Sequence, residues 1–251
     1  MAWPIDPIIF KVGSFQLTWY ALVYIIGFIV CTIALSKASK RKEINLKQSE
    51  VYDFVIILVI GMLIGARLFH IVFWDLSYFT NNPSEILRIW KGGMSFHGGL
   101  LGMLLISIYY SKKKKIDFFK LADILVLPAA LFLALARIAN YINHEILGTI
   151  TSSGWCVEFP GVSGCRHPVQ LYAAAGKLAL FFLLLYLKKK KHNIKSGFLF
   201  AIFLTLLGLG RFFLDFIRED IHYLGLSSGQ WFSAIMIIVG TTILIRLSKK
   251  N

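Results

Sequence analysis

Seven apolar segments divide this chain, and they constrain its fold more than any other feature of the sequence. A helix that crosses the hydrocarbon core of a bilayer needs about 17–25 such residues, and all seven segments fall within that range. The third is the weakest because its purely apolar part begins only after His97, so six spans is the main alternative. The segments are Leu17–Leu35, Val51–Phe73, Met94–Tyr110, Leu121–Ile142, Val169–Leu187, Gly197–Ile217 and Trp231–Leu247.

The composition supports a membrane protein and excludes other classes. Apolar residues make up 57% of the chain, above the about 45–50% of a soluble domain, so the chain is not disordered. The net charge is +14, but a nucleic-acid-binding protein would spread its basic residues over a water-exposed face, so we expect no nucleic-acid partner. No metal-ligand spacing or phosphate-binding loop occurs, and we expect neither a metal nor a cofactor. We predict an all-α polytopic membrane protein with seven transmembrane helices, in which residues 1–251 form one integral-membrane domain.

The basic residues predict the orientation of the spans. Eighteen of the 27 follow the odd-numbered segments, and with seven spans they all fall on one side of the membrane. The positive-inside rule makes that side cytoplasmic, with the N-terminus outside and the C-terminus in the cytoplasm. The first residues carry no basic start and no small-residue cleavage site, so we expect no cleavable signal peptide. The eighteen are Lys37, Lys40, Arg41, Lys42, Lys47, Lys112, Lys113, Lys114, Lys115, Lys120, Lys188, Lys189, Lys190, Lys191, Lys195, Arg246, Lys249 and Lys250.

Five polar side chains on different segments lie at a similar depth. At about 1.5 Å per residue they are about 21–26 Å above the cytoplasmic ends of their segments, near the outer leaflet. A single arginine at this level is explained by snorkelling to the headgroups. Three arginines and a histidine at one level instead favour a polar cavity that opens at the outer headgroups and admits a lipid phosphate. The five are Tyr20, Arg67, His97, Arg137 and Arg211.

Local spacing predicts which of these side chains have polar neighbours. Arg137 and Asn140 are three residues apart and share a helix face. Arg211 and Asp215 are four apart and can pair, although Asp215 and Arg218 form a competing pair at three. His97 stands beside two glycines at a helix start, where open space favours a chemical role over satisfied packing.

Small residues and cysteines add two further predictions. Gly61 and Gly65, and likewise Gly98 and Gly102, have the G-x-x-x-G spacing, so the second and third segments are expected to pack closely. Cys156 and Cys165 lie in the outside loop at about 143–168, and their spacing leaves both a disulfide and two free thiols open. This loop is the longest on the outside and is a candidate gate.

Six motifs along the chain carry a family resemblance. The most specific are the Gly-Gly-Met-Ser-Phe-His-Gly-Gly run and the Arg-x-x-Asn-x-x-Asn-x-Glu run. With these motifs the chain resembles the prolipoprotein diacylglyceryl transferase family, bacterial enzymes of the cytoplasmic (inner) membrane that have seven spans and an outside N-terminus. The six motifs are Trp19–Tyr20, Gly65–Arg67, Gly92–Gly99, Arg137–Gly148, Arg166–Tyr172 and Gly210–Arg218.

The resemblance implies a reaction and a set of site residues. The enzyme would move the diacylglyceryl group of phosphatidylglycerol to the lipobox cysteine of a prolipoprotein signal peptide, releasing glycerol phosphate, in the first step of lipoprotein maturation. Arg137 and Arg211 would hold the phosphate, and His97 is a candidate base for the thiol. The implied catalytic residues are His97, Arg137, Arg211, Tyr20 and Glu145. The implied substrate-binding residues are Arg137, Asn140, Asn143, Gly148, Arg67, Arg211, Gly98 and Gly99.

The chain also departs from the family pattern. Leu207 stands where the family commonly has tyrosine, which removes a hydroxyl from the site. Asp215 and Ala173 stand where it commonly has glutamate, and Ala136, Ala139 and His144 where it commonly has glycine. These departures leave open a slower enzyme, an altered lipid donor or an inactive relative.

Two other functions are compatible with the same arginines. One is a transporter or flippase for an anionic lipid or solute, which predicts charged positions in the cytoplasmic halves of the spans as well. Those halves are nearly all apolar, with Asp53 and Asp123 only at their ends. The other is a non-catalytic lipid-binding relative, which the loss of the hydroxyl at Leu207 keeps open.

Overall fold

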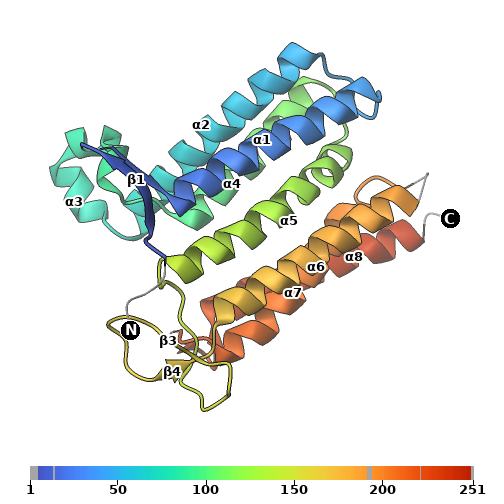
Figure 1. The fold of residues 1–251 in the computed structure, drawn as a ribbon. Helices are drawn as coiled ribbons and strands as arrows, with labels where there is room; N and C mark the ends of the chain where they lie inside the picture. Colours follow the sequence, from blue (N-terminus) through green and yellow to red (C-terminus); the bar gives the residue numbers. More distant parts are fainter. Residues whose placement is uncertain (1–4, 14, 191–193, 221, 250–251) are drawn as a thin grey trace. The chain divides into compact units, whose positions relative to one another are not determined.

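The computed structural model describes residues 5–13, 15–190, 194–220 and 222–249, and most of them are helical (Figure 1). Lys191 and Lys250, two of the basic residues that predict the orientation, lie outside the described residues. The chain divides into two compact units. Unit 1 contains Met1–Cys31 and Ala122–Asn251, and unit 2 contains Thr32–Leu121.

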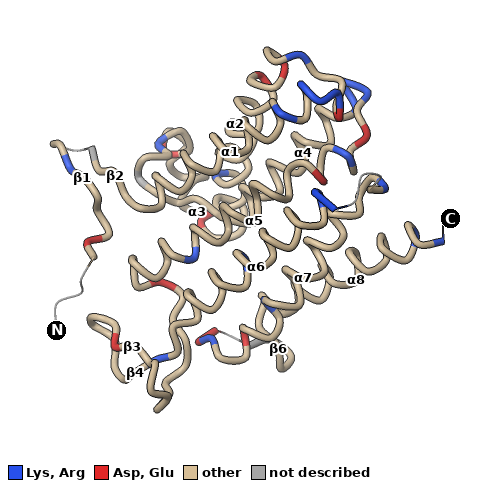
Figure 2. Tube along the Cα trace, turned by 45° about the vertical axis from the view of Figure 1, so that its right-hand side comes forward, with Lys and Arg blue, Asp and Glu red and all other residues tan. Residues whose placement is uncertain are grey.

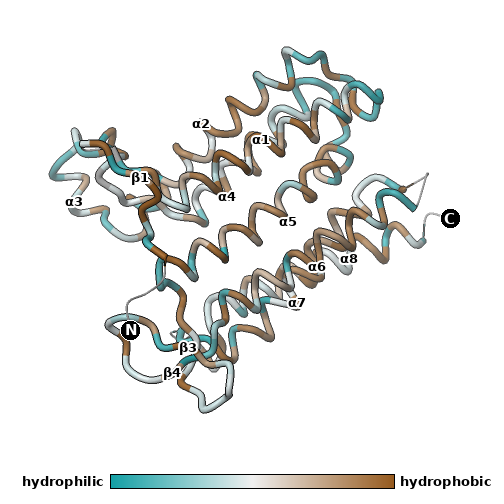
Figure 3. Tube along the Cα trace, viewed as in Figure 1, coloured by the Kyte–Doolittle hydropathy of each residue, from teal (hydrophilic) through white to brown (hydrophobic). Residues whose placement is uncertain are grey.

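Six helices in the described part of the chain are long and apolar enough to cross a membrane. This is the pattern of a multi-pass membrane protein, and the long helices are hydrophobic between hydrophilic ends (Figure 3). The six are α1 (Trp19–Lys40), α2 (Gln48–Phe73), α5 (Phe118–Ile142), α6 (Val169–Lys190), α7 (Phe198–Leu214, continued by a 3-10 turn to Ile217) and α8 (Ser228–Ser248). The third apolar segment forms α4 (Phe96–Lys113). This helix is not among the six, because its polar ends lower its mean hydropathy.

In unit 2, α2 and α4 pack closely through glycines, as the spacing predicted. A Cβ added to Gly65 would clash with the Gly98 carbonyl and lie 2.9 Å from the Gly102 Cα. A Cβ on Gly102 would clash with the Gly61 carbonyl. The segment between these helices forms α3 (Leu76–Asn81) and two 3-10 turns, η1 (Pro83–Leu87) and η2 (Ile89–Lys91).

The basic residues before α2 and after α4 share one end of unit 2 (Figure 2). Lys114 Nζ, after α4, lies 2.6 Å from Glu50 Oε1 at the start of α2. The hydrogen bond to this carboxylate raises the pKa of Lys114 above its ordinary value. Tyr110 donates its hydroxyl to the Glu50 carbonyl at 2.7 Å, which ties the same two helix ends together.

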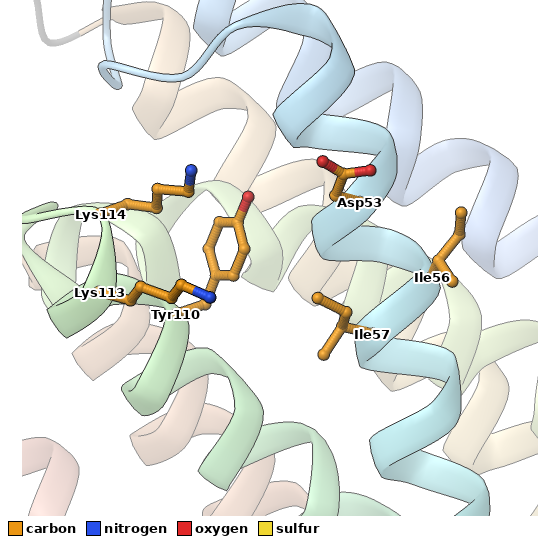
Figure 4. Close-up of a pocket in the computed structure, with 6 residues that line it drawn as sticks. All are labelled: Asp53, Ile56, Ile57, Tyr110, Lys113 and Lys114. Carbon is orange, nitrogen blue, oxygen red and sulfur yellow. The ribbon is translucent and has the colours of Figure 1, made fainter.

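A cleft lies between the basic ends of α2 and α4 (Figure 4). Asp53 on α2 precedes Arg67 by 14 residues, or about 21 Å of helix. The cleft is therefore at the opposite end of unit 2 from Arg67 and His97. Its lining residues are Asp53, Ile56, Ile57, Tyr110, Lys113 and Lys114.

In unit 1, α5, α6 and α7 enclose an apolar core, and α8 packs against α7. α7 and α8 approach each other closely at Gly208, where an added Cβ would lie 2.9 Å from the Ser233 carbonyl oxygen. Asp123 on α5 accepts hydrogen bonds from the backbone N–H groups of Gly197 (2.8 Å) and Phe200 (2.7 Å), so it caps the start of α7. The buried core residues are Val126, Ala130, Leu180, Leu184, Leu199 and Phe203.

The ends of unit 1 are also distinct. Lys195 Nζ donates to the Leu247 carbonyl at 2.9 Å, so the basic residues after α6 and after α8 share an end. Because α6 begins at Val169 and α8 at Ser228, the other end carries the starts of these helices and the ends of α5 and α7. The loop at about 143–168 lies there.

The described residues contain three short antiparallel hairpins, which the all-α prediction did not include. The first pairs β1 (Ile8–Val12) with β2 (Phe15–Thr18) ahead of α1. The second pairs β3 (Val157–Glu158) with β4 (Cys165–Arg166), and the third pairs β5 (His222–Tyr223) with β6 (Leu226–Ser227). Each uses only two to five residues per strand, so the fold remains helical.

Candidate functional site

Glu145 is the centre of a hydrogen-bonded network at the end of unit 1 that carries the loop. Tyr20, at the start of α1, donates its hydroxyl to Oε2 at 3.1 Å, and Asn140, near the end of α5, donates Nδ2 to the same oxygen at 2.8 Å. Asn140 Nδ2 also contacts the Tyr20 hydroxyl. Asn143 donates to Oε1 at 3.4 Å. Three predicted site residues from two helices and a loop therefore share the carboxylate of a fourth, Glu145.

Arg137 joins this network from one turn earlier on α5. Its Nη1 donates to Asn140 Oδ1 at 3.2 Å, which confirms that the two residues share a helix face. The side chain is half-buried. Because Asn140 donates to Glu145 and accepts from Arg137, it orients the guanidinium relative to the carboxylate.

Asp215, at the end of α7, lies between two arginines. Its side chain is only 3% exposed, and Arg211 Nε and Arg218 Nη1 each lie 3.8 Å from one of its oxygens. Both pairings that the sequence left in competition are therefore present. Ser227 donates its hydroxyl to Asp215 Oδ2 at 2.9 Å. Arg211 Nε is buried and has no hydrogen-bond partner in the described part of the chain, so this arginine keeps a donor for an incoming anion.

Residues at the start of α8 pack against Arg211 and Asp215. The sequence did not lead us to predict a role for these residues. A Cβ on Gly229 would lie 2.7 Å from Arg211 Nη2 and would clash with Asp215 Oδ2, so only glycine fits there. Ser227 and Gln230 form a reciprocal capping box, with bonds of 3.0 and 2.9 Å. The Ser-x-x-Gln spacing before the seventh apolar segment is the signal that identifies it.

The two networks belong to one region of positive charge. Arg211 and Arg218 lie within electrostatic range of Arg137, and so does Lys177 on α6. Asp215 is the buried carboxylate among them, and Asp220 pairs with Arg218 at 3.3 Å. Since cations exceed carboxylates in this region, it is suited to bind an anion.

Gly148 is held by backbone contacts in the loop that follows α5. It bridges to Arg218, and the neighbouring Thr149 N–H donates to the Ile217 carbonyl at 2.9 Å. A Cβ on Gly148 would lie 2.9 Å from the Cβ of His167. The need for glycine here is therefore explained by close approach of the chain.

Arg166 braces the same loop, and no role was predicted for it. It is 6% exposed, and its Nη1 donates to the Gly148 carbonyl at 3.0 Å and to Glu219 Oε2 at 2.5 Å. A disulfide between Cys156 and Cys165 closes the hairpin that carries it, with the two Cα atoms 5.4 Å apart. The structure thus decides between the two states that the cysteine spacing left open.

In unit 2, Arg67 is enclosed by backbone carbonyls. It donates Nε to Ile86 (3.0 Å), Nη2 to Glu85 (2.5 Å) and Nη1 to Gly92 (2.7 Å) and Gly93 (3.0 Å). Its guanidinium also lies 4.6 Å from the centre of the Phe79 ring, and the residue is 6% exposed. These contacts hold the segment that leads into α4. A role in binding substrate stays a prediction.

His97 is the second residue of α4 and is exposed. Ser95 caps this helix by accepting from the Gly98 N–H at 3.4 Å, and its own N–H donates to the Ala66 carbonyl at 3.0 Å. Gly98 and Gly99 are buried against α2, where a Cβ on Gly98 would clash with the Gly65 carbonyl. Gly98 is therefore needed for helix packing, whereas a Cβ on Gly99 would lie 3.3 Å from the Met62 side chain.

The candidates thus gather within each unit. Unit 2 holds Arg67, His97, Gly98 and Gly99 at the end away from Lys113 and Lys114. In the described residues of the chain, no group of three or more His, Cys, Asp or Glu side chains is arranged to hold a metal ion. Unit 1 brings together Tyr20, Arg137, Asn140, Asn143, Glu145, Gly148 and Arg211.

Comparison with known proteins identifies the family. The family model for prolipoprotein diacylglyceryl transferase matches residues 7–246. The chain belongs to the prolipoprotein diacylglyceryl transferase family. The chain is similar to proteins named phosphatidylglycerol–prolipoprotein diacylglyceryl transferase from several organisms. The one from Geobacter sulfurreducens is 39% identical over 98% of this chain and 97% of its own length. Those from Ehrlichia ruminantium (37%) and Pseudoalteromonas atlantica (36%) each align with 98% of this chain and with 98% and 91% of their own lengths.

Within this transferase family, the departures noted in the sequence have different structural settings. Leu207 packs against the apolar core of unit 1, so a side chain without a hydroxyl suits its surroundings. Ala173 is buried on α6. His144 has a φ of 58°, in the left-handed region where glycine is favoured. The family's usual glycine would adopt that turn with less strain.

Proposed function

We propose that this protein transfers the diacylglyceryl group of phosphatidylglycerol to the lipobox cysteine of a prolipoprotein signal peptide, the first step of bacterial lipoprotein maturation. The observation that carries the proposal is the excess of positive charge around Arg137 and Arg211 in a chain of this family. A phosphodiester is the anionic group that such a site would bind at a membrane surface.

In this reaction the cysteine sulfur attacks the glyceryl carbon that is bonded to the phosphate oxygen. The carbon–oxygen bond breaks, a thioether forms, and glycerol phosphate leaves with the bonding electrons. The thiol proton passes to a base. Arg137 and Arg211 would hold the phosphate and stabilise the charge that develops on its leaving oxygen.

The other candidates would activate or position the reactants. A free thiol has a pKa of about 8.5 and is mostly protonated at neutral pH, so the reaction needs a base to accept the thiol proton. His97 is the candidate for this base. The shared hydrogen bonds of Tyr20, Asn140 and Glu145 support a role in orienting Arg137 and the lipid esters. Asn143 and Gly148 would shape the mouth of the site. Arg67, Gly98 and Gly99 would position the start of α4.

The proposed topology has seven spans, with the N-terminus outside and the C-terminus in the cytoplasm, in the bacterial inner membrane. Support comes from Lys114, which lies at the same end of unit 2 as Glu50 at the start of α2, and from Lys195, which lies at the same end of unit 1 as Leu247 near the end of α8. The proposal adds α4 to the six long apolar helices and treats residues 1–251 as one integral-membrane domain, with the loop at about 143–168 outside. Labelling of single cysteines introduced into the loops would test it, and cytoplasmic labelling of the 143–168 loop would contradict it.

The activity is tested with purified protein, phosphatidylglycerol vesicles and a lipobox peptide. Mass spectrometry should detect a gain of one diacylglyceryl group on the peptide cysteine. The His97→Ala and Arg211→Ala variants should insert normally and give no lipidated peptide. Absence of product from the wild-type protein, combined with uptake or flipping of the lipid, would favour the transporter alternative.

A further inference from the structure

Lys177 is an ionisable side chain inside a membrane-spanning helix, and the proposed mechanism does not use it. It lies eight residues after the start of α6 at Val169, or about 12 Å along the helix. A lysine at this depth is unfavourable unless it faces the protein interior or a polar cavity, and such residues usually bind or move a ligand. The contacts of α6 show which of these settings Lys177 has.

Lys177 lies on the face of α6 that is buried in unit 1. Gln170, Ala173 and Ala174 precede it by seven, four and three residues, which places all four on one side of the helix. Those three residues are 1%, 8% and 4% exposed. Lys177 itself is half-buried. Because Gln170, Ala173 and Ala174 are buried on this face of α6, the Lys177 side chain on the same face also points into unit 1.

The ammonium group leans back toward the loop end of unit 1. Lys177 Nζ donates to the Ala173 carbonyl at 3.4 Å, one helical turn closer to the start of α6. That carbonyl is four residues from Val169, or about 6 Å along the helix. Arg137 and Arg211 lie about 8 and 5 Å from the ends of α5 and α7 at the same end of the unit. The three cationic groups thus have similar depths.

The surrounding charges leave Lys177 without full compensation. Arg137 and Arg211 are the cations within electrostatic range of it, and Asp215 is the carboxylate. Asp215 is already shared by Arg211 and Arg218. An anion bound among Arg137, Lys177 and Arg211 would supply the missing negative charge.

A second observation points to a ligand on the same face. The side-chain oxygen of Gln170 is buried and has no hydrogen-bond partner within the described residues. The amide nitrogen of Gln170 is used, since it donates to the Glu145 carbonyl at 2.7 Å. A buried acceptor without a donor is uncommon in a folded protein. A hydroxyl of a glycerol headgroup would satisfy it.

We propose that Lys177 is a third cationic ligand of the phosphate site, and that it binds the second negative charge of the leaving glycerol phosphate. This inference rests on the proposed function. The donor phosphodiester carries one negative charge. When the carbon–oxygen bond breaks, the phosphate keeps the electron pair and becomes a monoester with two negative charges, while the thiol proton goes to the base. Arg137 and Arg211 suit the first charge, and Lys177 provides the further positive charge that the product requires.

The test compares Lys177→Met, Lys177→Arg and the control Lys189→Met in the lipidation assay. Lys189 is exposed at the other end of α6, so its substitution gives the same change in net charge. Lys177→Met should lower kcat at least tenfold and change the KM for phosphatidylglycerol less than threefold. The inhibition constant of added glycerol 1-phosphate should rise about tenfold. Lys177→Arg should keep most of the activity, and Lys189→Met should resemble the wild type.

Three outcomes would overturn the inference in different ways. If the wild type forms no lipidated peptide, the proposed function fails and the inference fails with it. If the wild type is active and Lys177→Met matches Lys189→Met in kcat and in inhibition by glycerol 1-phosphate, only the inference fails. Thermal unfolding in detergent reports on folding, and Lys177→Gln provides a second neutral variant. If both neutral variants fail to fold while Lys177→Arg is active, the lysine is structural.

Discussion

Arg67 in unit 2 and Arg211 in unit 1 are both arginines near the end of an apolar helix, but the structure uses them differently. Arg67 donates four hydrogen bonds to backbone carbonyls within its own unit. Arg211 lies 3.8 Å from its nearest carboxylate oxygen and keeps a buried donor without a partner in the described residues. A guanidinium has five N–H donors. The number of these donors that are already bonded within the protein distinguishes the two arginines. Arg67 uses most of its donors to hold a loop, whereas Arg211 keeps donors that can bind a ligand.

Loss of Arg211 is expected to have the largest effect on activity. Arg211→Ala should lower the rate of diacylglyceryl transfer by about 100- to 1000-fold, because a positioned donor to the developing charge is removed. Thermal unfolding should change less than for Arg67→Met, since Arg218 and Ser227 still contact the buried Asp215 carboxylate. The matched control is Arg246→Ala, at an exposed position near the end of α8. A near-wild-type rate for Arg211→Ala would remove the distinction between the two arginines.

Loss of Arg67 should instead reduce stability. Arg67→Met leaves four carbonyls without their donor, and we expect the free energy of unfolding to fall by about 3 kcal/mol. Arg67→Lys should recover little of this, because an ammonium cannot reproduce the planar fork of donors.

Chemical denaturation in detergent micelles would measure the effect of Arg67→Met. Arg88→Met is the control in the same segment, since the Arg88 side chain is 46% exposed and loss of its ion pair with Glu85 should change stability by less than about 0.5 kcal/mol. If Arg67→Met remains fully stable but loses activity per folded molecule, Arg67 belongs with Arg211 as a ligand-binding residue.

The smallest expected effect comes from the network that orients Arg137. Tyr20→Phe removes one of two hydrogen bonds to Glu145 Oε2 and leaves the bond from Asn140. We expect about a tenfold lower rate, in line with the loss of one hydrogen bond to a charged group. Tyr24→Phe is the control, one turn further along α1, where the ring packs against Phe132. Equal rates for the two variants would show that the Tyr20 hydroxyl has no role in the site.

Features that depend on local spacing were predictable from the sequence. Gly61, Gly65, Gly98 and Gly102 predicted the close packing of α2 and α4, because a helix repeats its faces every three to four residues. The same periodicity predicted that Arg137 and Asn140 share a face. The resemblance of the motifs supplied the family and the candidate residues. It did not supply their contacts.

Other contacts join residues far apart in the chain and had no local signal. Asp123 caps a helix that begins 75 residues later at Phe198. Gly148 needs its lack of a side chain because His167 approaches it, and Gly229 because Arg211 and Asp215 do. Arg166, which lies between Gly148 and Glu219 in the sequence, donates hydrogen bonds to both of them. These contacts depend on the path of the loops, which short-range patterns do not encode.

The sequence by itself determined that this is a helical membrane protein of a lipid-transferring family, because apolar length, charge placement and motif spacing are properties of single segments. The tertiary structure decided what each polar residue does at its position. In the folded chain, Arg67 donates to backbone carbonyls, and Asp215 lies between two arginines. Cys156 and Cys165 form a disulfide, and Lys177 points into the interior of unit 1. The physical reason is that a buried charge takes its role from the partners around it, and those partners come together only when the chain folds.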